Sequence, residues 1–142
     1  MLVKDVMTKE VKTVLKGSTL QEAGKLLTDF HVGCLIVIDP NERVVGIVTE
    51  SDIIRNLVSG KPLTTKVDEC MTKKVFYVKP EDDLHDAVEL MSENRIKKLP
   101  VLKNNQLVGI LTATDIAAAE PKHLDQLGEL MLHSQRQKGI AG

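Results

Sequence analysis

Two copies of one short pattern contain the residues of this chain that could bind a small polar molecule. Gly46-Ile47-Val48-Thr49-Glu50-Ser51-Asp52 returns as Gly109-Ile110-Leu111-Thr112-Ala113-Thr114-Asp115. In each copy an apolar run ends at a threonine, an aspartate follows three residues later, and a helical pattern begins. A hydroxyl and a carboxylate therefore meet at a strand-to-helix junction, where unpaired backbone N–H groups favour a phosphate. A carboxylate also accepts two hydrogen bonds from a vicinal diol such as that of ribose.

The same spacing has a purely structural interpretation. A threonine at the N-cap with an acid at the third helical position stabilises any helix, by about 0.5–2 kcal/mol. For one isolated copy we would favour this interpretation. Because the pattern occurs twice at matched places, we favour a binding role that coexists with capping.

Both junctions belong to an internal repeat. Val3–Ile38 aligns with Val67–Leu102, and Val44–Ile53 aligns with Leu107–Ile116 after one extra residue in the first copy's turn. Each copy predicts an amphipathic turn ending in Met-Thr-Lys, a short strand, a helix, two strands joined by a turn, and a final helix. The predicted fold class is α+β, with two repeated β-α-β-β-α units packed about a pseudo-two-fold axis.

Local signals place several elements. The first extended pieces are expected at Val11–Val14 and Val75–Val78, and Ser18 with Gln21 predicts a capping box at the start of the first long helix. The unbroken apolar run Leu35–Ile38 indicates a strand covered on both faces. Gly60 is a plausible helix stop.

The boundaries follow from the repeat. We expect the first unit at residues 1–60, a linker at 61–66, the second unit at 67–120, and a C-terminal helix and tail at 121–142. Leu124, Leu127, Leu130 and Met131 have helical spacing. An amphipathic helix outside the repeats covers either its own domain or a second subunit, and we expect Gln135–Gly142 to be frayed.

Composition narrows the class of protein. The chain has 142 residues, 42% of them hydrophobic, so it can bury a core without a metal or a disulfide. A net charge of -1 and 2% aromatic residues argue against nucleic-acid binding. No apolar run approaches the roughly 20 residues of a membrane span. Cys34 and Cys70 form no CxxC pair, which favours reduced thiols and a cytoplasmic location.

The doubled Met-Thr and Gly-h-h-Thr-x-x-Asp patterns, where h is an apolar residue, resemble a tandem pair of CBS domains, often called a Bateman module, over about residues 3–120. The resemblance implies a stand-alone regulatory module that binds AMP, ADP or ATP, with S-adenosylmethionine or dinucleotides such as NAD bound in some members. It implies no catalysis and no required cofactor. It further implies a homodimer formed through helical faces, with output through an unidentified effector protein.

The resemblance also implies residue roles. Asp52 and Asp115 would hold ribose hydroxyls, with Thr49 and Thr112 beside them. Lys97 and Lys98, just before the Leu-Pro-Val strand, would reach the phosphates; an exposed charged edge is the alternative for both. The matching stretch His31–Cys34 has no Lys or Arg, which leaves one good phosphate site. The residues expected to border the adenine are Val32, Gly33, Lys12 and Phe76.

Other functions have less support in the sequence. There is no nucleophile–base–acid set, Walker loop or glycine fingerprint, so we predict no enzyme and no catalytic residue. His31 and Cys34 lack a second ligand pair, so no metal site is predicted. The main alternative is a structural protein–protein interaction module without a small-molecule ligand, docking through Leu124–Met131. Nucleic-acid binding through Lys97 and Lys98 ranks last.

Overall fold

The computed structural model describes residues 1–131, which divide into two compact units. Unit 1 contains Met1–Glu10, Phe76–Asn104 and the described residues from Val108 onward, and unit 2 contains Val11–Val75 with Asn105–Leu107. Each unit has its own hydrophobic core. The mixture of helices and small sheets confirms the predicted α+β class.

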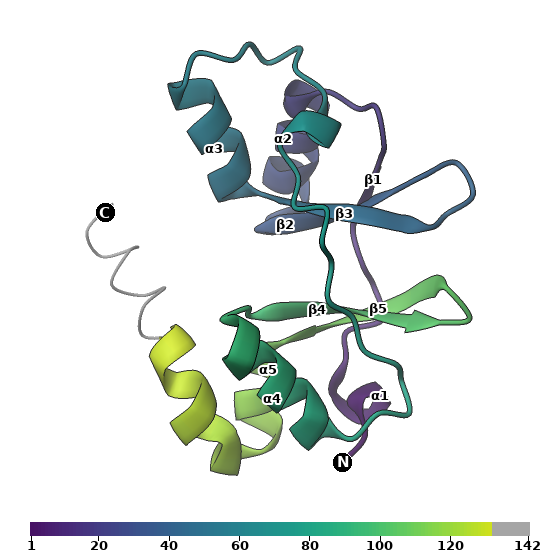
Figure 1. Cartoon of the computed structure of the whole chain (residues 1–142), viewed down its shortest axis with the longest axis vertical. Coiled ribbons are helices and arrows are strands. Elements are labelled where there is room, and N and C mark those ends of the chain that lie inside the picture. The colour runs from purple at the N-terminus through teal and green to yellow at the C-terminus, as the bar shows by residue number, and fades with distance from the viewer. Residues whose placement is uncertain (132–142) are drawn as a thin grey trace. The chain divides into compact units, whose positions relative to one another are not determined.

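Unit 2 is a three-stranded sheet with two helices on one of its faces (Figure 1). β1 (Thr13–Leu15) pairs in parallel with β2 (Cys34–Ile38), and β2 pairs antiparallel with β3 (Val44–Thr49). The helices are α2 (Leu20–Phe30) and α3 (Glu50–Val58). This order reproduces the predicted β-α-β-β-α sequence of elements.

The long apolar strand is buried as its sequence predicts. Leu35, Ile36 and Val37 are fully buried, and Cys34 is nearly so. The start of α2, however, lies one residue later than predicted. Thr19 is the N-cap and accepts the N–H of Glu22 at 3.1 Å. This register makes Leu20 the first helical residue and places it, fully buried, in the core.

Unit 2 ends in the segment between the repeats. α3 ends at Val58, and Gly60 has φ +100°, so the glycine allows the left-handed turn that stops the helix, as predicted. A short 3-10 helix, η1 (Val67–Glu69), follows.

Unit 1 has a two-stranded sheet and several helices. The N-terminal helix is α1 (Val3–Val6), and α4 (Leu84–Asn94) is a longer helix of 11 residues. β4 (Lys98–Lys103) and β5 (Gln106–Thr112) form a hairpin, and α5 (Ala113–Ala119) follows directly. The two turn residues between the strands, Asn104 and Asn105, both have positive φ, which suits a tight hairpin turn and which asparagine tolerates well.

The first predicted strand of the second copy is reduced to one bridge. Val78 pairs in parallel with Val101, and no strand forms over Val75–Val78 in the described structure. A turn follows directly, in which the Lys79 N–H donates to the Asp82 carboxylate at 2.8 Å. Pro100 shortens the ladder because it has no N–H to donate, whereas Ile36 at the equivalent position donates to the Lys12 carbonyl.

The first residues of each repeat pack in the unit built mainly from the other repeat. Val3 is fully buried in the unit 1 core with Val88 and Leu111. Val67 is fully buried in the unit 2 core with Leu20 and Val48. The sequence repeats and the packing units therefore do not coincide.

The C-terminal segment covers unit 1. A short 3-10 helix, η2 (Pro121–His123), leads into a helix over residues 124–131. Leu127 is fully buried in the unit 1 core and Met131 packs against it, while Leu124 stays 44% exposed. Of the two expected roles for this helix, covering its own domain or a second subunit, the burial of Leu127 shows the first. The expected frayed end at Gln135–Gly142 lies outside the described residues. Over residues 1–131, no helix has both the length and the apolar character to span a membrane.

Candidate functional site

The ten residues singled out from the sequence fall into two sets, one in each unit. Each set contains a Thr–Asp junction, the pre-strand segment and one residue near the first extended piece. We call the β3–α3 turn the unit 2 junction and the β5–α5 turn the unit 1 junction. Unit 2 holds Lys12, Val32, Gly33, Thr49 and Asp52. Unit 1 holds Phe76, Lys97, Lys98, Thr112 and Asp115.

At the unit 2 junction the aspartate has a full set of local partners. Thr49 is the N-cap of α3, and its hydroxyl accepts the N–H of Asp52 at 3.2 Å. In return, the Thr49 N–H donates to Asp52 Oδ2 at 2.9 Å, which completes a capping box. Arg55 Nη1 lies 3.2 Å from Asp52 Oδ1. The capping interpretation of the motif is therefore correct for this junction.

At the unit 1 junction the aspartate is held more loosely. The Thr112 hydroxyl accepts the N–H of Asp115 at 3.1 Å, so Thr112 is again the N-cap, but the reciprocal bond of a capping box does not form at this helix. The Asp115 carboxylate instead accepts a long hydrogen bond, 3.4 Å, from the hydroxyl of Thr8. Asp115 is partly exposed, whereas Asp52 is 9% exposed.

The residues just before β2 and β4, Gly33 and Lys97, are attached to these junctions through backbone hydrogen bonds. The Ala113 N–H donates to the Lys97 carbonyl at 2.8 Å, and the Glu50 N–H donates to the Gly33 carbonyl at 3.1 Å. Lys97 and Gly33 occupy equivalent positions in the repeat. The structure thus brings Lys97, and with it the partly buried Lys98, to the edge of the unit 1 junction.

Lys12 and Phe76 lie beside the first extended piece of their repeats and not within a strand. The Lys12 carbonyl accepts the N–H of Ile36, and the Lys12 ammonium lies 4.2 Å from the centre of the Phe30 ring. Phe76 packs against the unit 1 core. Their expected place beside an adenine remains a prediction.

The sequence did not assign the Met-Thr pairs to the junctions. Thr8 pairs antiparallel with Ile110, with N···O distances of 2.8 and 2.9 Å, and Thr72 pairs in the same way with Ile47. Each threonine therefore pairs with the strand residue that directly follows a motif glycine. The repeated Met-Thr-Lys triplet was the available signal, but periodicity alone cannot show which strand it joins.

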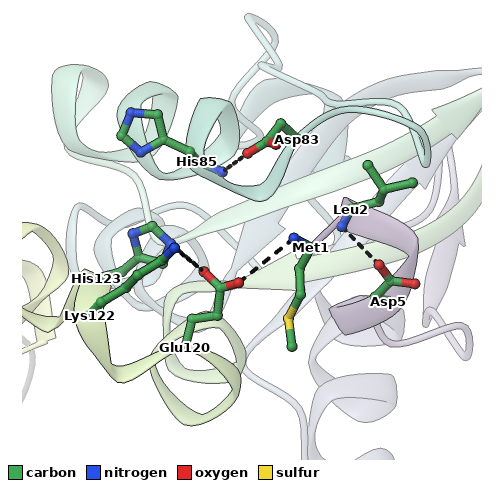
Figure 2. Close-up of polar contacts among 8 residues, drawn as sticks. All are labelled: Met1, Leu2, Asp5, Asp83, His85, Glu120, Lys122 and His123. Carbon is green, nitrogen blue, oxygen red and sulfur yellow. Dashed lines mark hydrogen bonds and ion pairs between the residues drawn. The ribbon is translucent and has the colours of Figure 1, made fainter.

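A separate cavity of about 380 Å³ lies in unit 1. Figure 2 shows the polar contacts around it. Glu120 Oε2 lies 2.8 Å from Nε2 of His123, which is 4% exposed, and 3.6 Å from Lys122 Nζ. The Met1 amino group lies 3.8 Å from Glu120 Oε1. Desolvation acts to raise the pKa of Glu120, but the His123 hydrogen bond and the positive charges of Lys122 and Met1 together lower it below its ordinary value.

Asp83 and His85, two further polar residues of this cavity, also have partners within the unit. Asp83 is the N-cap of α4 and accepts the N–H of His85 at 2.8 Å, and His85 Nε2 lies 3.1 Å from Glu89. Over residues 1–131, no three His, Cys, Asp or Glu side chains are grouped to hold a metal ion. Internal pairing makes this cavity a weaker candidate than the junctions.

Comparison with known proteins identifies the family of this chain. The CBS domain family model matches residues 3–59 and 67–122. The chain belongs to the CBS domain family. CBS domain-containing protein YhcV of Bacillus subtilis is 36% identical over 116 residues, which are 81% of this chain and 82% of that protein.

Solved structures agree with this CBS assignment. An uncharacterized conserved protein from Pyrococcus horikoshii is 35% identical, with a TM-score of 0.75 over 83% of this chain and 90% of the other. The CBS domain pair of protein MJ0100, solved with 5′-methylthioadenosine and S-adenosyl-L-methionine, is 28% identical, with a TM-score of 0.76 over 84% and 94%. The predicted tandem CBS fold is therefore confirmed.

Proposed function

We propose that this CBS protein is a regulatory module that binds an adenosine-containing ligand at the unit 1 junction. The observation that carries the proposal is the environment of the Asp115 carboxylate. It is partly exposed, and its hydrogen bond from the Thr8 hydroxyl is long, at 3.4 Å. A bond of this length is weak, so it is easily exchanged for a better donor. A ribose diol offers two donors to one carboxylate.

The surrounding groups support the same ligand class. Lys97 and Lys98 lie at the edge of this junction, where ammonium groups suit the phosphates of AMP, ADP or ATP. Thr112 adds a hydroxyl beside Asp115. The relative solved with 5′-methylthioadenosine and S-adenosyl-L-methionine supports the adenosine part of the proposal, since both compounds have an adenine and a ribose diol. S-adenosylmethionine and NAD therefore stay in the set of candidate ligands.

The proposed action is regulatory. We expect no catalysis, a cytoplasmic homodimer, and an effector protein that distinguishes the ligand-bound state from the free one. Such a device requires the ligand to bind one of two arrangements of the protein more tightly than the other.

The test is thermal unfolding of the purified protein with AMP, ADP, ATP, NAD, S-adenosylmethionine and GTP. A ligand at 100 times its dissociation constant adds about 2.7 kcal/mol, which raises the melting temperature by several degrees. We expect a shift with at least one adenosine compound and none with GTP. Flat curves across the panel would contradict the proposal.

A second function has one observation in its favour. Ile54 and Val58 on α3 are 59% and 82% exposed, as expected of a surface that contacts another protein. A protein–protein interaction module without a ligand would give flat melting curves. It would also show a change in sedimentation when Val58 is replaced by Asp. The Leu124–Met131 surface is a poorer candidate for docking than predicted, because Leu127 is buried in its own unit.

A further inference from the structure

We infer that Arg55 masks Asp52, so that the unit 2 junction is closed to the ligand and each chain binds one ligand, at the unit 1 junction. The inference rests on the proposed function, because it concerns the second copy of the same site. It identifies Arg55 as the residue that sets the number of ligands per chain.

Both oxygens of the Asp52 carboxylate are in use. Oδ2 accepts the Thr49 N–H at 2.9 Å, and Oδ1 receives Arg55 Nη1 at 3.2 Å. A guanidinium is always charged, so this contact is present at any pH at which the carboxylate is ionised. A diol that approached Asp52 would have to displace Arg55.

Burial reinforces the mask. Asp52 is 9% exposed. The Asn56 side chain donates to the Asp52 backbone carbonyl at 2.7 Å, which fixes the first turn of α3 around the aspartate. The carboxylate is therefore both paired and hidden from solvent.

The second copy has neither the arginine nor the asparagine at the aligned positions. When the alignment of Asp52 with Asp115 is continued, Arg55 corresponds to Ala118 and Asn56 to Ala119. A methyl group cannot pair with the carboxylate of Asp115. The two junctions thus have the same Thr–Asp motif but differ in whether the aspartate is accessible.

The mask depends on a single side chain. Arg55 is 71% exposed at its side chain, so its replacement disturbs little of the packing around α3. Removing Arg55 leaves the capping box of Thr49 and Asp52 in place and uncovers Oδ1. One substitution should therefore open a second site without unfolding α3.

The experiment is isothermal titration calorimetry with AMP and with S-adenosyl-L-methionine. The wild type should bind one ligand per chain and Arg55→Ala two. Asp115→Asn should weaken binding about ten- to hundredfold. The double variant Asp115→Asn/Arg55→Ala should recover binding, now at Asp52. Arg43→Ala, an exposed arginine of the same unit, controls for the loss of one positive charge and should keep one ligand.

Two results would overturn the inference. One is two equal sites in the wild type, and the other is a double variant that binds no better than Asp115→Asn alone. A ligand-independent measurement separates this inference from the proposed function. The side-chain NMR signal of the Arg55 guanidinium in the free protein should shift in Asp52→Asn. If no adenosine compound of the thermal-unfolding panel binds, the proposed function fails. If the Arg55 signal does not change in Asp52→Asn, the inferred contact between Arg55 and Asp52 is overturned as well.

Discussion

The side chain of Met7 lies directly against Gly109, where a Cβ added to the glycine would come 2.7 Å from the Met7 sulfur and 3.0 Å from the Thr8 carbonyl. In unit 2 the same relationship joins Met71 to Gly46, with 2.5 Å to the sulfur. A glycine is therefore required at each motif position, because the Met-Thr segment that pairs with its strand leaves no space for a Cβ. The glycine belongs to the packing of the junction and need not touch a ligand.

Gly109→Ala should destabilise the protein. The added methyl group overlaps the Met7 side chain and presses on backbone, which typically costs about 1–3 kcal/mol. Chemical denaturation should show this loss in the free energy of unfolding. The matched control is Gly24→Ala within α2, where nothing lies within 4 Å of an added Cβ. That variant should gain about 0.5–1 kcal/mol from helix propensity, and equal effects of the two variants would contradict the packing explanation.

The repeat explains how much of the fold could be predicted from the sequence. Duplicated patterns located the two junctions, and Thr49 and Thr112 are N-caps as their spacing predicted. Apolar spacing also located the helices and the buried strand at Leu35–Val37. These are local signals, in which the residues that decide the structure are neighbours in the chain.

The features that sequence reasoning missed depend on contacts between distant residues. Nothing in the local pattern shows that Thr8 pairs with Ile110, or that its hydroxyl reaches Asp115. The difference between the two aspartates arises from Arg55, which the motif itself does not include. The pairing of Glu120 with a buried His123 was likewise missed, because a lone histidine on a helical pattern gives no signal of its partner.

The two motif aspartates should differ in their effect on stability. Asp52→Ala loses the capping-box bond and the Arg55 contact and should cost about 1–2 kcal/mol. Asp115→Ala should cost less than about 1 kcal/mol, because the Asp115 side chain contributes its charge near a helix start and a long bond to Thr8. Urea denaturation of both variants measures the difference. Under our proposal the order of the two variants is reversed for ligand binding, which Asp115→Ala weakens more than Asp52→Ala. A larger stability loss for Asp115→Ala would show that its carboxylate is structural.

His31→Gly should stabilise unit 2. His31 ends α2 in the left-handed conformation, with φ 53°, and its side chain is exposed. Glycine adopts this conformation without the strain that a Cβ introduces, so the gain should be about 0.5–1 kcal/mol. His31→Ala is the control because it removes the imidazole and keeps the Cβ. Thermal unfolding should show a gain for glycine alone; equal gains would mean that loss of the ring, not relief of strain, is responsible.

Glu120 should make the stability of unit 1 depend on pH. Its pKa is lowered from the ordinary value of 4.5 in the folded state. Folding therefore favours the ionised form, and the stabilisation is complete above the unfolded pKa and is lost as the pH falls through the folded pKa. The difference in unfolding free energy between wild type and Glu120→Gln should shrink as the pH falls below about 4.5. Glu81→Gln, at an exposed pair with Lys4, controls for the removed charge, and a difference that grows on acidification would contradict the assignment.

Leu127→Ala should show that the C-terminal helix is part of unit 1. Leu127 is fully buried among Val88, Met91 and other residues of that core. Truncating such a side chain leaves a cavity and costs about 2–5 kcal/mol. Leu124→Ala makes the same change about one helical turn earlier, at a side chain that is 44% exposed, and should cost well under half as much. Denaturant unfolding compares the two variants at equal helix propensity. If Leu127→Ala proved as mild as Leu124→Ala, the helix would be a detachable segment and its docking on a partner would again be the better hypothesis.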